Sequence, residues 1–173
     1  MSLYVGLLAT LLSNFALAQR PVSINDQAHQ YIFSFQEIEF VEDAGNDLSI
    51  DEVSAPGFSK RFSPSLSFSP ENYNRASAYW YRIRVRHDPQ TKHEWKLEFF
   101  DQTIDRIDFY IPDGGSGFVR ESFGDSFPFY ERPLRHKNFF VKLPGESEGI
   151  QTYYFKVKSR QQANILLVLR TSD

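Results

Sequence analysis

Short runs of alternating apolar and polar residues constrain the fold of this chain more than any other feature of its sequence. The clearest run extends from Tyr79 to His87. Comparable runs cover residues 93–99, 104–111, 139–143, 153–157 and 165–169. A period of two places successive side chains on opposite faces of an extended strand, so each run indicates a strand with one buried face. Turn-forming residues separate the runs and helical periodicity is scarce, which predicts an all-β domain, a β-sandwich or jelly roll.

The alternation also assigns each side chain to one of the two faces of its strand. The core face is expected to hold Tyr81, Ile83, Val85, Trp95, Leu97, Ile107, Phe109, Val141, Phe155 and Val157. The opposite face holds Trp80 and Arg82 on one strand, and Arg106, Asp108 and Tyr110 on another. Aromatic residues make up 16% of the chain, which is consistent with broad, half-buried sheet surfaces.

Composition excludes several kinds of function. The chain has 173 residues, enough for one domain with a substantial core. Its formal net charge is -3, so no cationic excess exists to neutralise a phosphate backbone, and nucleic acid is not expected as a partner. The absence of cysteine excludes disulfides, thiolate zinc sites and a cysteine nucleophile. Residues 114–117 follow Pro112 and Asp113 as a hairpin turn would, and match neither a nucleophile elbow nor a phosphate loop, so no enzymatic activity is expected.

The N-terminal residues differ from the rest of the chain. Residues 5–18 form an apolar run that ends in an A-x-A pattern, Ala16 to Ala18, before Gln19. Such a run is typical of a secretory signal peptide and is too short to span a bilayer as a stable helix. The sequence therefore predicts a signal peptide over residues 1–18 and a single β-sandwich domain over residues 19–173. We expect this domain in the periplasm or another extracytoplasmic space, anchored to a membrane through sequence absent from this chain.

The region before the clearest strands combines a strand, a helical turn and a loop. Residues 31–41 have the composition of a strand. Ser49 is followed by Glu52 three residues later, a capping-box spacing that predicts a single helical turn up to Val53. Residues 55–74 are rich in Ser, Pro and Phe and lack periodicity, which indicates a long covering or functional loop.

The face opposite the core mixes aromatic rings with charged groups, a combination that suits sugars. A flat ring supplies a stacking surface, and fixed donors and acceptors bind the hydroxyl groups. If these strands share one sheet, the ligand-binding face consists of Trp80, Arg82, Arg106, Asp108 and Tyr110, with Arg132, Arg135 and His136 from the basic loop 130–138 at its rim. A second interpretation has equal weight: a solvated, salt-bridged face with Trp80 and Tyr110 packed under loop 55–74.

Two aspartates are weak candidates for a metal site. Jelly-roll binding modules often hold a structural calcium ion, which takes several oxygen ligands. Asp101 and Asp105 are the residues that we would test for it. No other cofactor is expected.

Five segments resemble, in their order and spacing, the extracellular sensor domain of the 7TM diverse intracellular signalling receptors, in its second type, 7TMR-DISMED2. The segments are Phe35–Val53, Ala78–Ile83 with a W-x-R motif, Asp105–Tyr110, Gly124–Asp125 with Phe129–Asn138, and Tyr153–Ser159. The resemblance covers essentially the whole chain after the predicted signal peptide. Trp80, Arg82, Arg106 and Asp108 fall on recurring motif positions of the family.

The resemblance implies a jelly-roll fold similar to that of carbohydrate-binding modules. It also implies a receptor in which this domain precedes seven transmembrane helices and a cytoplasmic output domain. The function expected from it is a periplasmic sensor that binds a saccharide or a similar small polar ligand. The alternative is a protein-interaction module that signals through homodimer contacts of the same face, without a small ligand. A ligand face should be concave, and an interface broad and flat.

Overall fold

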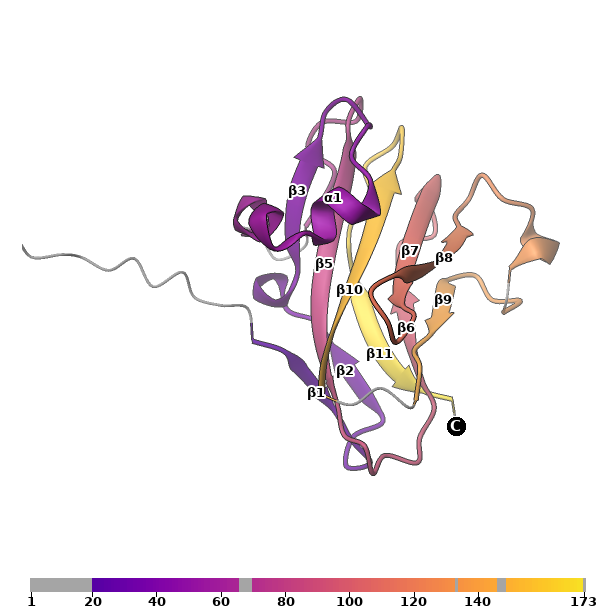
Figure 1. Ribbon diagram of the computed structural model, residues 1–173. Coiled ribbons are helices and arrows are strands. Elements are labelled where there is room, and N and C mark those ends of the chain that lie inside the picture. The colour runs from indigo at the N-terminus through magenta and orange to yellow at the C-terminus, as the bar shows by residue number, and fades with distance from the viewer. Residues whose placement is uncertain (1–19, 66–69, 133, 146–148, 173) are drawn as a thin grey trace, which may run out of the picture.

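Two β-sheets pack face to face in this protein (Figure 1). The computed structural model describes residues 20–65, 70–132, 134–145 and 149–172. The large sheet contains β1 (Val22–Ile24), β3 (Glu39–Asp43), β4 (Ser63–Pro64), β5 (Ala78–His87), β7 (Arg106–Pro112), β8 (Phe118–Phe123) and β10 (Gly149–Lys158). The small sheet contains β2 (Gln30–Ile32), β6 (Trp95–Phe99), β9 (Phe139–Lys142) and β11 (Leu167–Thr171). The all-β sandwich predicted from the sequence is confirmed, while its jelly-roll variant stays a prediction.

The strand order explains how distant segments become neighbours. The large sheet runs β4-β3-β5-β10-β7-β8, with β1 added to β5, and the small sheet runs β2-β11-β6-β9. The pairing of β1 with β5 is parallel, and the other pairings among the described residues are antiparallel. Since β5 and β7 both pair with β10, their side chains share the two faces of one sheet.

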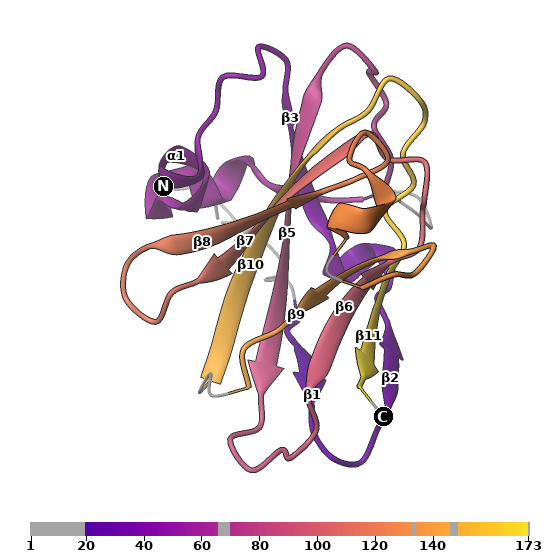
Figure 2. The same cartoon turned by 90° about the vertical axis from the view of Figure 1, so that its right-hand side faces the viewer.

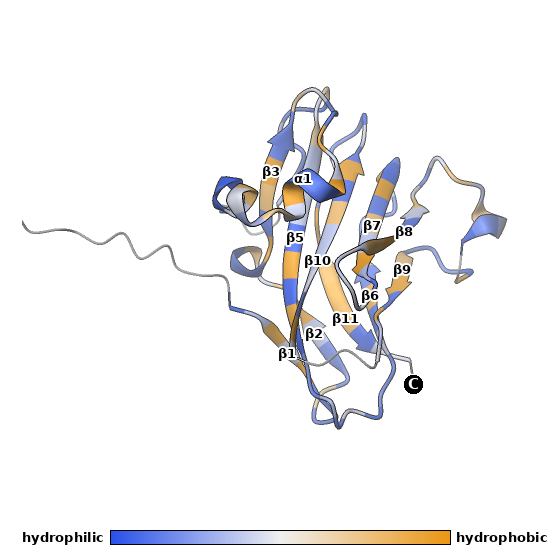
Figure 3. Cartoon of the chain, in the orientation of Figure 1, coloured by the Kyte–Doolittle hydropathy of each residue, from blue (hydrophilic) through white to orange (hydrophobic). Residues whose placement is uncertain are grey.

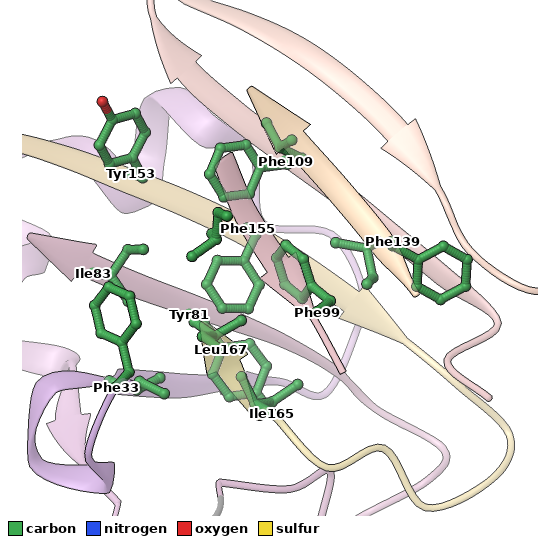
Figure 4. Close-up of a cluster of buried hydrophobic side chains, with 14 of the residues drawn as sticks. Phe33, Tyr81, Ile83, Phe99, Phe109, Phe139, Tyr153, Phe155, Ile165 and Leu167 are labelled. Atoms are coloured by element: carbon green, nitrogen blue, oxygen red, sulfur yellow. The ribbon is translucent and has the colours of Figure 1, made fainter. Parts of the chain in front are cut away.

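The core lies between the sheets and has the composition that the alternation predicts. All ten residues expected on the core face are buried in one cluster. Phe109 stacks against Tyr153 and Phe155 at ring-centroid distances of 5.9 and 6.1 Å, and Phe99 meets Phe155 edge-on at 5.2 Å (Figure 4). Offset and edge-on arrangements are the favoured geometries of aromatic pairs. The alternating hydropathy along the strands is visible in Figure 3.

The strand predicted over residues 31–41 is interrupted. The chain leaves the small sheet after β2, forms the 3-10 turn η1 (Phe35–Glu37), and enters the large sheet at β3. The backbone N–H of Ser34 donates to Glu37 Oε2 at 2.7 Å, which caps the turn. A local polar capping box thus breaks an otherwise strand-like composition so that the chain crosses between the sheets.

A covering segment, residues 48–62, lies on the face of the large sheet opposite the core, here called the outer face. It contains α1 (Ile50–Ser54) and η2 (Pro56–Arg61) and leads into the edge strand β4. The predicted helical turn is confirmed: Ser49 caps α1 in a capping box with Glu52. Figure 2 shows α1 on the side of the large sheet away from β6 and β11. Beneath the segment lies a second apolar cluster that includes Val53, Phe62, Trp80 and Tyr154.

Two further predictions concern the N-terminal signal peptide and the membrane. The predicted signal peptide, residues 1–18, lies outside the described residues. Within the described ranges, no helix has the length and apolar character needed to cross a membrane.

Candidate functional site

A pocket of about 390 Å³ opens on the outer face beside the covering segment. It is lined by Asn46, Leu48, Trp80, Arg106, Asp108, Tyr110, Arg120, Lys156 and Lys158. Four of these residues, Trp80, Arg106, Asp108 and Tyr110, belong to the ligand face predicted from the sequence. The register brings them together because Lys156 of β10 lies opposite both Trp80 of β5 and Asp108 of β7.

Two aromatic rings form one wall of the pocket. The rings of Trp80 and Tyr110 lie 5.2 Å apart with an interplanar angle of 31°, and Lys156 Nζ lies 5.3 Å from the Trp80 ring centroid. Trp80 is only 1% exposed, because the covering segment packs over it. Its buried Nε1 donates to no described group. Trp80 therefore offers no open stacking platform, and the more exposed ring at this wall is that of Tyr110. Ligand contact at Trp80 stays a prediction.

Arg106 and Asp108 form a hydrogen-bonded ion pair at the pocket. Arg106 Nε donates to Asp108 Oδ2 at 2.9 Å, and Nη2 donates to Oδ1 at 2.9 Å. Ser122 Oγ also donates to Asp108 Oδ1, at 2.5 Å. Burial alone would raise the pKa of Asp108, but the hydrogen bonds from Arg106 and Ser122 outweigh it and lower the pKa. Asp108 is therefore a fixed anion that orients the Arg106 guanidinium.

Lys156 connects the pocket to the covering segment. Its ammonium lies 2.8 Å from Asp43 Oδ2 and donates to the backbone carbonyl of Leu48 at 3.2 Å. Burial would raise the pKa of Asp43, yet the hydrogen bond and charge of Lys156 lower it. This pair is mostly buried, with side-chain exposures of 13% and 1%.

The other two cations of the pocket have no carboxylate partner among the described residues. Arg120 lies opposite Tyr110 in the register; burial raises the pKa of the Tyr110 hydroxyl, and the neighbouring Arg120 opposes this shift. Lys158 Nζ donates to the backbone carbonyl of Ala76. Both positive charges are therefore available to an acceptor in the pocket.

Arg82 does not line the pocket. It is 4% exposed and contacts Glu39 Oε2 at 2.5 Å, and its Nη1 donates to Ser59 Oγ at 2.8 Å. Its guanidinium lies 4.4 Å from the centroid of the Phe62 ring. Glu39 lies opposite Arg82 in the register and η2 contacts it, so direct ligand contact by Arg82 stays a prediction that this arrangement does not favour. Arg82 instead holds the covering segment on the sheet.

The basic loop predicted as the rim lies elsewhere. Arg132, Arg135 and His136 follow η3 (Phe129–Glu131), which Figure 1 shows on the side of the molecule opposite α1. Arg132 donates to the carbonyls of His136 and Lys137 at 3.1 and 3.0 Å, and its guanidinium lies 4.6 Å from the Phe139 ring centroid. None of the three lines the pocket, because the chain crosses here from β8 to β9 of the other sheet.

The family model for "7TMR-DISM extracellular 2", 7TMR-DISMED2, matches residues 35–171. The chain belongs to this family. No curated protein matches it. Members of 7TMR-DISMED2 are extracellular sensor domains of seven-transmembrane receptors, not a family of enzymes, and they act with the transmembrane region of the same receptor. The family assignment made from the sequence motifs is confirmed.

Sequence reasoning missed several pocket residues of this 7TMR-DISMED2 domain. Lys158 and Arg120 follow from the same alternation, since each occupies a non-core position of its strand. Asn46 and Leu48 carry no such signal. They approach the pocket because the turn after β3, with Asn46 at φ 55°, folds the chain back over the sheet.

The two aspartates considered for calcium are engaged by protein donors. Asp101 accepts from the backbone N–H of Thr103 at 2.9 Å and of Asn164 at 2.8 Å. Asp105 accepts from the backbone N–H of Arg160 at 2.9 Å. No group of three or more His, Cys, Asp or Glu side chains within the described ranges could hold a metal ion. Calcium binding at Asp101 and Asp105 stays a prediction.

Proposed function

We propose that this 7TMR-DISMED2 domain works in the periplasm and binds a saccharide, or a similar small polar ligand, in the outer-face pocket. The observation that supports this most is the convergence of Trp80, Arg106, Asp108 and Tyr110 on one concave site. These residues come from two strands, β5 and β7, which β10 brings together in the sheet. Binding there would be reported to the transmembrane region of the receptor.

The chemistry of the pocket fits a sugar ring. Its volume lies at the lower end of the range for ligand pockets and suits one or two sugar units. Tyr110 offers an aromatic face, while the Arg106–Asp108 pair offers donors and an acceptor with fixed geometry. The Asp108 carboxylate is held ionised by its partners, so it remains an acceptor at neutral pH.

The alternative, a homodimer formed through the same face, has less support. An interface of that kind needs a broad and flat surface. Here the covering segment occupies part of the outer face, and the remainder is hollowed.

A glycan screen by thermal shift tests the proposal, because a bound ligand raises the melting temperature of the folded state. For a ligand found in this way, Arg106→Gln should weaken binding about tenfold with little change in melting temperature. Arg170→Gln is a matched control, because the Arg170–Glu98 pair lies on the small sheet with comparable exposures of 38% and 4%. Equal affinities for Arg106→Gln and the wild type would refute binding at this pocket.

A further inference from the structure

A second hollow adjoins the pocket. It has a volume of about 500 Å³ and is lined by Asp105, Arg106, Ser126, Phe127, Lys158 and Arg160. It shares Arg106 and Lys158 with the pocket, and these residues lie opposite one another on β7 and β10. The two hollows therefore lie side by side with Arg106 and Lys158 at the boundary between them, and together they are here called the groove.

The second hollow has a rigid frame. The backbone N–H groups of Asp125 and Ser126 donate to the carbonyls of Ile104 and Asp105 at 2.8 and 3.1 Å. Gly124 has a φ of 146°, and a Cβ there would lie 2.3 Å from the carbonyl oxygen of Asp105. Only glycine permits this approach. The turn places Phe127 so that the Arg106 guanidinium lies 5.6 Å from its ring centroid.

The groove is positively charged on a protein of negative net charge. Arg106, Arg120, Lys156, Lys158 and Arg160 line it, against the carboxylates of Asp105 and Asp108, while Asp43 neutralises Lys156. The whole chain carries a net charge of -3. A local excess of one sign in a concave site raises the concentration of ions of the opposite sign.

We propose that the ligand is an acidic oligosaccharide that lies along both hollows, with carboxylate or sulfate groups at Arg120 and Lys158. This inference rests on the proposed function and adds the charge and the length of the ligand. Tyr110 in one hollow and Phe127 in the other offer rings to two sugar units, and the unpaired cations meet the anionic groups. A single small anion would fill neither the groove nor its aromatic walls.

Calorimetric titration of the chain with oligosaccharides of matched length tests whether the ligand is acidic. The probes are tetrasaccharides of galacturonate, of mannuronate and guluronate, and of sulfated galactose, beside neutral galactose and mannose tetrasaccharides. At least one acidic probe should bind about tenfold more tightly than its neutral counterpart, since charge-assisted contacts are roughly twice as strong as neutral ones. Its affinity should fall severalfold between about 50 and about 200 mM NaCl, because salt screens exposed charges. The uronate and sulfate arms show which acidic group is preferred.

Three variants test where the oligosaccharide binds and how far it extends along the groove. Arg120→Gln and Lys158→Gln should each weaken the acidic tetrasaccharide about fivefold or more without lowering the melting temperature. Arg160→Gln removes a side chain that is 87% exposed. It should weaken binding of the acidic tetrasaccharide but not of a disaccharide of the same acidic sugar, which is too short to reach the second hollow. Lys142→Gln is the control, because Lys142 is an exposed cation on the small sheet.

The outcomes separate this inference from the function on which it rests. Equal binding of neutral and acidic sugars, with Arg106→Gln still weakening both, would overturn the acidic ligand and leave the sugar sensor intact. Unchanged acidic binding in Arg120→Gln and Lys158→Gln would also overturn it. If no sugar of either kind binds, both the inference and the sugar-binding function fail.

Discussion

The two faces of the large sheet are built from the same strands but differ in what covers them and in how their side chains are partnered. On the inner face, Phe109, Tyr153 and Phe155 belong to one apolar cluster that packs against the small sheet, and the buried His87 Nε2 lies 2.9 Å from the Tyr153 hydroxyl. On the outer face, the intervening residues Asp108, Tyr154 and Lys156 meet a covering segment and a pocket. One face gains stability mainly from apolar burial, whereas the other combines a small apolar cluster with individually partnered charges. The same strand can therefore supply a core with its alternate residues and a polar site with the residues between them.

The largest expected effect comes from the inner face. Phe109→Ala removes a fully buried ring that stacks on Tyr153 and Phe155, so it should lower the free energy of unfolding by about 3–5 kcal/mol. Chemical denaturation measures this. Val119→Ala on the neighbouring strand, where the side chain is 56% exposed, should change stability by less than about 0.5 kcal/mol. Similar losses in the two variants would contradict the assignment of the core.

A somewhat smaller effect should come from the buried ion pair of the outer face. Glu39→Gln leaves the Arg82 guanidinium buried without its counter-charge, which should cost about 3 kcal/mol. Glu94→Gln breaks the exposed pair with Lys142, and exposed pairs contribute little to stability, so its melting temperature should not change. A Glu39→Gln protein as stable as the wild type would show that Arg82 is not held by Glu39.

A substitution at the cap of α1 should loosen the covering segment without loosening the core. Ser49→Ala removes the N-cap of α1, which should cost about 1 kcal/mol and loosen this segment. Hydrogen exchange should accelerate at the amides of Val53 and Ala55, which are bonded within the helix end, and stay unchanged at Phe155. Equal acceleration at both places would mean that the segment and the core open as one unit.

The smallest expected effect is the acid response of the outer face. The pKa values of Asp43 and Asp108 are lowered in the folded protein by their hydrogen bonds to Lys156, Arg106 and Ser122, so the unfolded chain takes up protons first as the pH falls. The stabilisation that these two carboxylates provide is fully present above the ordinary aspartate pKa of the unfolded chain, and it is lost as the pH falls through their lowered pKa values in the folded protein. Melting curves between about pH 5 and about pH 2 measure this loss. Asp108→Asn should make the curve shallower, and an unchanged slope would contradict the role of Asp108.

The residues of the inner face could be predicted from sequence because they depend only on the alternation of side chains between the two faces of a strand. Tyr81, Ile83 and Val85 alternate with Arg82 and Arg84, and a period of two leaves only one apolar face. The same parity placed Arg106, Asp108 and Tyr110 on the pocket face, and the motifs identified the family.

The outer face could be predicted only in part, because its surroundings come from distant residues. Burial of Trp80 depends on Val53 and Phe62, which belong to a segment without periodicity. The partner of Arg82 depends on the register between β3 and β5. The position of Arg132 could not be predicted for another reason. Alternation within strands does not show which sheet the chain enters after a loop, and here it passes from β8 of the large sheet to β9 of the small sheet.

The central position of β10 has a consequence for the energetics of recognition. Lys156 and Lys158 alternate along this strand with Phe155 and Val157, which are held in the core. The backbone beneath the two ammonium groups is thus immobilised before any ligand arrives, and the entropy cost of ordering it was met during folding. A ligand in the groove has only the outer parts of these side chains to order, so more of its contact energy appears as affinity.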